Sequence, residues 1–163
     1  MGVQPKIWDR YKMRRLPKYN SEHNLYEQVA RYLQLQYPDV IYRFDIAADL
    51  KLTPGQAAKH KRLHPERGYP DLFIAKPKEV KVKTALGGGY ILVEAKTLSG
   101  LYLEIKTESN SPYKKDGTLK KDQHLEEQAK MLEKLRARGY RAEFGVGFEG
   151  CKQIIDEYFK KQD

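Results

Sequence analysis

Two long segments with a helical repeat of apolar residues alternate with short runs of strand-forming residues, and this alternation is the strongest constraint on the fold. The first helix is predicted over 21–37, because Ser21 can act as its N-cap and Pro38 marks its end. The second is predicted over 119–138, and the glycine at 139 is the residue type that commonly follows a helix C-terminus. Neither segment suits an all-β architecture.

The remaining chain supplies strands and two shorter helices. Strands are predicted over 40–46, 72–75, 79–84, 90–96, 101–107 and 141–147, and helices around 55–63 and over 149–160. The segments 79–84 and 90–96 are expected to form a β-hairpin, inserted at about 76–99 between two strands of the main sheet. The order is helix, strand, strand, hairpin, strand, helix, strand, helix, which predicts a mixed α/β domain over 21–163.

Length and composition exclude several classes of protein. A chain of 163 residues suits one domain with its own core. The single cysteine, Cys151, cannot form an internal disulfide, and no segment approaches the ~20 apolar residues that span a bilayer. Charged residues stand where a signal peptide would need its apolar part. We therefore expect a cytoplasmic protein, with packing as the default role of the thiol.

The net charge of +9, from 31 basic and 22 acidic residues, indicates a polyanionic partner. Basic residues gather in the N-terminal arm over 1–20 and in 59–67, 76–83 and 114–121. Six cations of these clusters are predicted to contact DNA: Lys59, Lys61, Arg62, Arg67, Lys114 and Lys115. A solvated surface is the alternative meaning of any single charge run.

One group of charged residues indicates a catalytic site. Asp71 begins one predicted strand, and Glu104 and Lys106 lie on one side of a later strand because side chains alternate along it. If these strands are neighbours, two carboxylates and the Ile105 main-chain carbonyl converge as oxygen ligands of the kind that Mg²⁺ or Mn²⁺ prefers. The metal would activate water, and Lys106 would hold that water and a phosphate oxygen.

Taken alone, the Asp…Glu-x-Lys pattern is common, since alternating charges usually mark a solvent-facing strand. The same spacing recurs at Glu94-Ala95-Lys96. That second pair sits in a predicted hairpin arm, whereas Glu104 and Lys106 lie on a strand that leads through a polar loop into a long helix. We favour Glu104 and Lys106, because a strand that feeds a helix can collect catalytic groups from both elements.

Two polar residues on the predicted helices have open interpretations. Gln128 falls on the apolar stripe of the helix over 119–138, where it either meets an adjacent site or lies at the edge of the stripe. Glu22 lies on the core side of the first helix, and it either joins the site or favours the helix N-terminus through the helix dipole.

These residues together resemble a known family. The segments Arg67-Gly-Tyr-Pro-Asp-Leu-Phe-Ile74, Gly100-Leu-Tyr-Leu-Glu-Ile-Lys106 and Glu127-Gln128, with Leu135 and Gly139-Tyr140, resemble a stand-alone VRR-NUC domain. This is a branch of the PD-(D/E)xK nuclease superfamily that is found in phages and prophages. The same domain forms the nuclease module of the Fanconi-associated structure-specific nuclease. The resemblance covers about residues 21–160.

The resemblance implies a restriction-endonuclease-like mixed sheet flanked by helices, and metal-dependent hydrolysis of DNA phosphodiester bonds. It implies Asp71 and Glu104 as metal ligands and Lys106 as a catalytic residue, with Gln128 and Glu22 matching further site positions. Stand-alone members resemble Holliday-junction resolvases that dimerise, so the resemblance also implies branched or flap-like DNA and a homodimer, in the host cytoplasm if a phage encodes the chain. The inserted segment departs from the family pattern. The alternative function is a non-catalytic DNA-binding or interaction module.

Overall fold

The computed structural model describes residues 22–45, 51–88 and 90–160. The predicted basic arm over 1–20 and the predicted cap at Ser21 lie outside these residues. The helices are α2 (Glu22–Gln36), α3 (Pro54–Leu63), α4 (Gln123–Ala137) and α5 (Gly147–Phe159). The strands are β1 (Tyr42–Phe44), β2 (Leu72–Ile74), β3 (Lys78–Gly87), β4 (Tyr90–Leu98), β5 (Leu101–Lys106) and β6 (Arg141–Val146).

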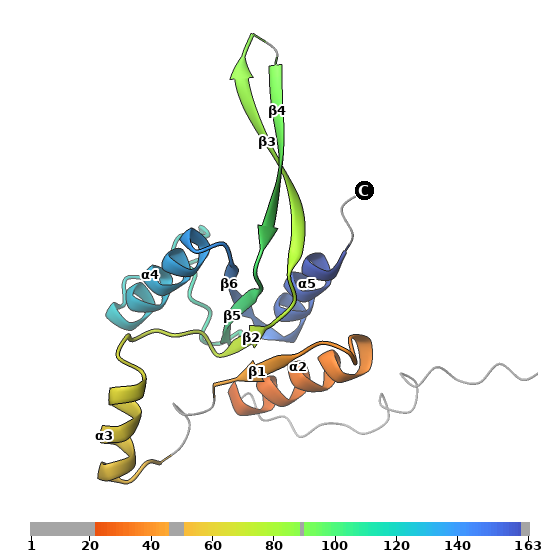
Figure 1. Cartoon of the computed structure of the whole chain (residues 1–163). Coiled ribbons are helices and arrows are strands. Elements are labelled where there is room, and N and C mark those ends of the chain that lie inside the picture. The colour runs from red at the N-terminus through yellow and green to blue at the C-terminus, as the bar shows by residue number, and fades with distance from the viewer. Residues whose placement is uncertain (1–21, 46–50, 89, 161–163) are drawn as a thin grey trace, which may run out of the picture.

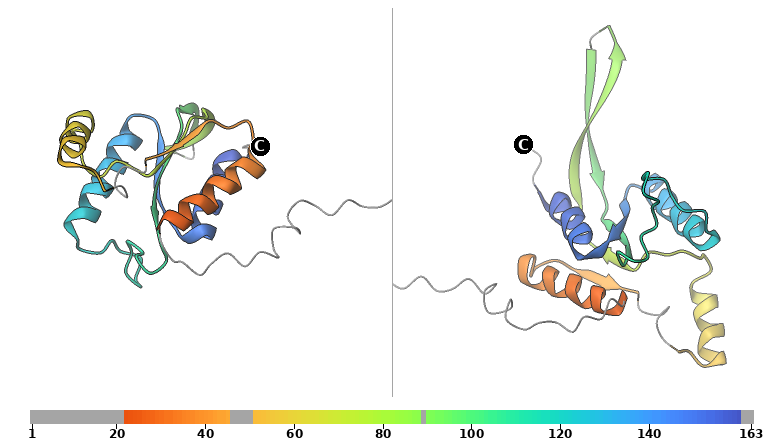
Figure 2. Two further views of the ribbon diagram at one scale, coloured as in Figure 1. Left: turned by 90° about the horizontal axis from the view of Figure 1, so that it is seen from below. Right: turned by 180° about the vertical axis from the view of Figure 1, so that it is seen from behind.

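A mixed four-stranded sheet with the order β1-β2-β5-β6 forms the centre of the molecule. The pairs β1–β2 and β2–β5 are antiparallel, while β6 lies parallel to β5 because the connection between them crosses over through α4. Helices α2 and α5 cover one face of the sheet and α4 covers the other (Figures 1 and 2). This arrangement confirms the predicted α/β fold with a mixed sheet flanked by helices.

Strand β5 is buried along its whole length, which the charged pattern did not predict. The expected alternation is present: Leu101, Leu103 and Ile105 pack into the core beneath α2 and α5, which also contains Cys151. The opposite face, which carries Glu104 and Lys106, is covered rather than solvent-exposed, because α4 packs a second core around Tyr102. The carboxylate and the ammonium group of β5 are therefore held inside the protein.

Two element boundaries differ from the predictions. Strand β1 is shorter than the predicted strand over 40–46, although residue 46 lies outside the described part. Helix α4 begins at residue 123 rather than 119, because the Asp122 side chain caps it by accepting a hydrogen bond from the Leu125 N–H at 2.9 Å. Among the described residues, no helix is both long and apolar enough to cross a membrane.

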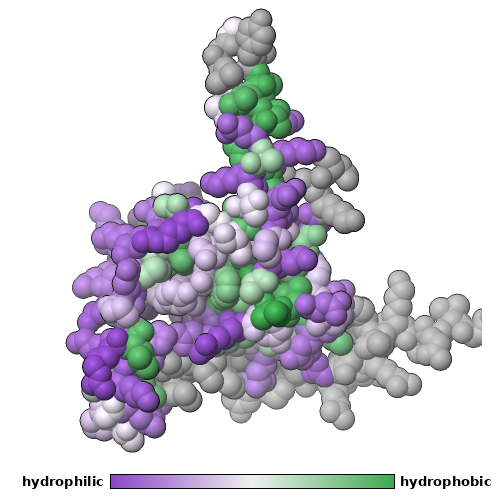
Figure 3. Space-filling view, viewed as in Figure 1, coloured by the Kyte–Doolittle hydropathy of each residue, from purple (hydrophilic) through white to green (hydrophobic). Residues whose placement is uncertain are grey.

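The inserted hairpin is longer than predicted and forms an arm of its own, residues 78–98, that projects from the body of the protein (Figure 1). Strands β3 and β4 pair only with each other. Hydrophobic side chains alternate with hydrophilic ones along the arm (Figure 3), and Val82, Ile91, Leu92 and Val93 are all exposed. An isolated two-stranded hairpin gains little stability in water, so the packing of its base matters. There Lys78 donates a hydrogen bond to the Glu157 carbonyl of α5 at 2.9 Å.

Asp156 ties α5 to α2 and gives a prediction for stability. Its carboxylate accepts hydrogen bonds from Tyr32 and Tyr37 and lies 3.2 Å from the Lys152 ammonium group. Burial opposes ionisation, but these partners outweigh it and lower the pKa of Asp156. Because the ionised form is favoured in the folded state, this stabilisation is complete above the usual carboxylate pKa and is lost as the pH falls through the lowered value.

We therefore expect Asp156→Asn to lower the free energy of unfolding at pH 7 by about 1–3 kcal/mol, the usual value of hydrogen bonds to a charged group. Urea unfolding of both proteins at pH 7 and at pH 3 tests this. The difference between wild type and variant should shrink in acid. A difference that stays constant with pH would show that the charge of Asp156 does not stabilise the fold.

Candidate functional site

The antiparallel pairing of β2 with β5 builds the centre of the candidate site. Leu72 lies opposite Leu103, so Asp71, which immediately precedes β2, lies beside Glu104. The Asp71 Oδ2 atom accepts a hydrogen bond of 2.7 Å from the Ile105 N–H. This contact clamps the Asp71 carboxylate against the backbone of β5. The two carboxylates predicted from the sequence are thus brought together on neighbouring strands.

Glu104 is surrounded by polar groups inside the protein, with only 2 % of the residue exposed. Its Oε1 atom accepts a hydrogen bond from the Gln128 side-chain amide of α4 and lies 2.9 Å from the Lys106 ammonium group. Its Oε2 atom is buried and has no hydrogen-bond partner among the described residues, and the same holds for Gln128 Oε1. Two unpartnered buried oxygens are costly, which indicates that the site is shaped for a further polar ligand.

The pKa shifts of Asp71 and Glu104 also indicate a site for a further ligand. Burial raises the pKa of both carboxylates, and for Glu104 the negative charge of Asp71 adds to this rise. The hydrogen bond from Ile105 and the charge of Lys106 act against the shift of Asp71, but they do not cancel it. The buried Glu104 and the partly buried Asp71 meet one ammonium group, that of Lys106, among the described residues, so the site is short of positive charge.

Helix α2 adds two residues to the periphery of the site. The negative charge of Glu22 raises the pKa of both Asp71 and Glu104, so Glu22 lies within electrostatic range of the pair, and its role in the site stays a prediction. The side chain of Tyr26, one turn further along α2, donates a hydrogen bond to Asp71. Tyr26 was not predicted, although its place one turn after Glu22 on the same helix face was a usable signal.

Gly68 explains how Gln128 reaches the strands. The backbone of Gly68 has a φ of +73°, and a Cβ atom there would lie 2.8 Å from the Gln128 main-chain nitrogen. Only glycine permits this close contact between the loop and the backbone of α4. The contact fixes α4 directly over β5. Gly68 belongs to the segment 67–74 that resembles the VRR-NUC domain, but its contact with α4 was not predicted.

The two Glu-x-Lys pairs differ in their burial. Glu94 and Lys96 are exposed on the arm, whereas Glu104 and Lys106 are buried beside Asp71. The six predicted DNA contacts are all exposed and lie on α3 and in loops: Lys59, Lys61, Arg62, Arg67, Lys114 and Lys115. Their contact with DNA stays a prediction.

The donor atoms fit a hard divalent cation. Asp71, the unpartnered Oε2 of Glu104 and the main-chain carbonyl of Ile105 offer oxygen ligands only, the set that Mg²⁺ and Mn²⁺ prefer over sulfur or nitrogen donors. Within residues 22–45, 51–88 and 90–160, no group of three or more histidine, cysteine, aspartate or glutamate side chains is placed to hold a metal. A cation bound here would therefore complete its coordination with water or substrate oxygens.

Comparison with known proteins identifies the fold. No protein-family model and no curated protein matches the chain. A solved structure described as a "VRR_NUC domain protein" superposes with a TM-score of 0.53 over 87 % of this chain and 90 % of its own, at 22 % sequence identity. The chain has the fold of a VRR-NUC domain. This supports the expected restriction-endonuclease-like architecture, and at this identity the similarity extends to the fold alone.

Proposed function

We propose that this protein is a metal-dependent endodeoxyribonuclease that hydrolyses phosphodiester bonds. One observation carries the proposal: the partly buried Asp71 lies beside the buried Glu104, whose Oε2 atom has no hydrogen-bond partner in the described part of the chain, and Lys106 lies 2.9 Å from Glu104 Oε1. A structural ion pair would leave no such oxygen unsatisfied. The shared fold with a VRR-NUC domain protein supports the same activity.

Each site residue has a role in this proposal. Asp71, Glu104 and the Ile105 carbonyl would hold Mg²⁺ or Mn²⁺, which supplies Lewis-acid stabilisation of phosphate and lowers the pKa of water. The Lys106 ammonium group orients the attacking water and neutralises a phosphate oxygen as negative charge develops there. The Gln128 amide donates to Glu104 Oε1 and so directs Oε2 toward the ligand. Tyr26 orients the Asp71 carboxylate through its hydrogen bond, and Glu22 adds negative charge near the metal ligands.

We further propose branched or flap-like DNA as the substrate and a pair of chains as the active form. The resemblance to junction-resolving domains supports both, and the exposed apolar arm offers a surface that a second copy could cover. Paired active sites would cut two strands of a four-way junction at related positions. Light scattering at micromolar concentration should then give twice the chain mass of 19.0 kDa. A mass of one chain would contradict the paired form.

The decisive experiment is a cleavage panel. Labelled single-stranded, duplex, flap and four-way DNA are incubated with the protein in Mg²⁺, Mn²⁺ or EDTA. We expect cutting in either metal, preference for a branched substrate, and no cutting in EDTA. Salt-sensitive binding without hydrolysis of any substrate would instead establish the alternative function, a DNA-binding module whose acidic pair serves only structure.

Metal binding should also be visible in thermal stability. Because a cation relieves the repulsion between Asp71 and Glu104, Mn²⁺ at 100 times its Kd should stabilise the fold by about 2.7 kcal/mol. For a chain of this size that corresponds to a rise in Tm of roughly 5–10 °C. Differential scanning calorimetry of wild type and Glu104→Gln, each with Mn²⁺ or EDTA, measures the effect. The variant should lose most of the rise, and an equal rise in both proteins would place the metal elsewhere.

A further inference from the structure

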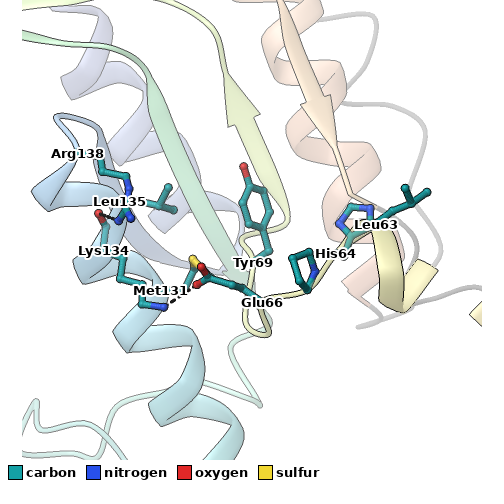
Figure 4. Close-up of a pocket in the computed structure, with 9 residues that line it drawn as sticks. Leu63, His64, Glu66, Tyr69, Met131, Lys134, Leu135 and Arg138 are labelled. Carbon is teal, nitrogen blue, oxygen red and sulfur yellow. Dashed lines mark hydrogen bonds and ion pairs between the residues drawn. The ribbon is translucent and has the colours of Figure 1, made fainter. Parts of the chain in front are cut away.

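An exposed aromatic ring separates two pockets next to the candidate site. Tyr69 is 45 % exposed and lies two residues before Asp71. It lines a pocket of about 290 Å³ that reaches Arg138 at the C-terminal end of α4, and a second of about 430 Å³ that reaches Arg43 on β1. Figure 4 shows Tyr69 in the first pocket, between the side chains of α4 and His64. The two pockets share Tyr69 and His64 as lining residues, so they adjoin at these side chains, and the pair of pockets is called the groove below.

The ring of Tyr69 is held in place by its contacts with Tyr102. Its hydroxyl lies 2.8 Å from the Tyr102 hydroxyl, and the two rings meet edge to face at 5.6 Å between centroids. Tyr102 in turn stacks on Phe73 at 4.5 Å. This packing fixes Tyr69 at little further entropic cost when a ligand binds. The ring is therefore a rigid platform rather than a mobile surface side chain.

The lining of the groove suits a chain of bases and phosphates. The apolar part of the first pocket consists of Leu63, Met131 and Leu135, against which a flat base can pack. Each pocket contains one arginine, which can bind a phosphate. Two carboxylates also line the groove: Glu66 pairs with Lys134 at 2.6 Å, and Asp45 lies in the pocket of Arg43. The Asp45 carboxylate offsets the charge of Arg43 in its pocket, so Arg138 supplies the positive charge that remains in the groove to meet a phosphate.

We infer that this groove binds single-stranded DNA. Its bases stack against Tyr69, which lies in the segment of the protein that leads into Asp71. Base stacking on an aromatic ring between cations is how proteins bind unpaired strands. A duplex keeps its bases stacked inside, so its backbone could contact the arginines but no base could pack against Tyr69. The inference rests on the proposed function, and it specifies that function: the substrate has unpaired nucleotides beside the bond that is cut.

The test measures binding in EDTA, so that it does not depend on hydrolysis. Fluorescence anisotropy gives the Kd of wild type, Tyr69→Ala and Tyr69→Phe for a labelled ten-nucleotide oligothymidine and for a labelled duplex of equal length. Stacking of one base contributes about 1–3 kcal/mol, which corresponds to a 5- to 150-fold loss in affinity for the single strand in Tyr69→Ala. Tyr69→Phe keeps the ring and should stay within about threefold of wild type, and duplex binding should change by less than about twofold in both variants.

Tyr113 provides a matched control, because it is 41 % exposed and lines neither pocket. Tyr113→Ala should bind the single strand as wild type does. An equal loss in Tyr113→Ala, an equal loss for duplex, or no loss in Tyr69→Ala would each overturn the inference. If the protein cuts DNA while Tyr69→Ala binds the single strand normally, only this inference fails. If Tyr69→Ala loses single-strand binding but wild type cuts nothing, the inference holds and the nuclease proposal fails.

Discussion

Glu104→Gln and Lys106→Met should each reduce DNA cleavage at least about 10³-fold while the protein stays folded. The expected loss follows from the chemistry, since removing a metal ligand or the cation beside it forfeits several kcal/mol of transition-state stabilisation, and each 1.36 kcal/mol is a factor of ten. Initial rates on the preferred substrate in Mn²⁺ measure the effect. Circular dichroism melts of the same preparations show whether the fold is retained.

The chain contains its own control for this experiment. Glu94 and Lys96 have the same spacing but are exposed on the arm, so Glu94→Gln and Lys96→Met should keep their cleavage rates within about threefold. A loss confined to the buried pair supports the site formed with Asp71. Equal losses in the two pairs, or a loss only in the arm pair, would contradict it.

Gly68→Ala should cause the largest loss of stability of any single methyl group added to a described glycine. Its backbone is left-handed, which costs a residue with a Cβ about 1–2 kcal/mol, and the new atom would lie 2.8 Å from the Gln128 main-chain nitrogen. Because that neighbour is helix backbone, it cannot rotate away. We expect a total of about 3–5 kcal/mol, measured by urea unfolding. Failure of the variant to fold would be the extreme form of the same result.

A variant at Gly117 separates the cost of the left-handed backbone from the cost of the close contact with α4. It has a φ of +81°, but a Cβ atom there would meet nothing within 4 Å. Gly117→Ala should therefore lose only the conformational part, about 1–2 kcal/mol. The difference between the two variants measures the close contact of the loop with α4. Equal losses would show that this contact does not hold α4 in place.

The order and type of the elements followed from local patterns, because hydrophobic periodicity and helix-terminating residues act within one segment. The choice of Glu104 over Glu94 also followed, since the helix after β5 distinguishes the two contexts. The burial of both faces of β5 could not be predicted from local sequence patterns. Alternating charges resemble a solvent-facing strand, and only the packing of α4, distant in sequence, covers them.

Other parts of the site depend on contacts between distant segments. The hydrogen bond from Ile105 to Asp71 requires the register of β2 on β5, which no local pattern specifies. Gly68 was visible only as a glycine, because neither the sign of its φ nor its approach to α4 is encoded nearby. Gln128 had two equal interpretations, and burial beside Glu104 distinguishes them in favour of the site.

The arm has a consequence for how such a chain can diversify. It departs after Ile74 and returns before Leu101, at the end of the β2–β5 pair that is remote from Asp71 and Lys106. Insertions, deletions or new surface chemistry in the arm leave the pairing that aligns the carboxylates untouched. The arm can therefore change in length and surface chemistry, and so in the molecules it contacts, while the geometry of the candidate site is preserved.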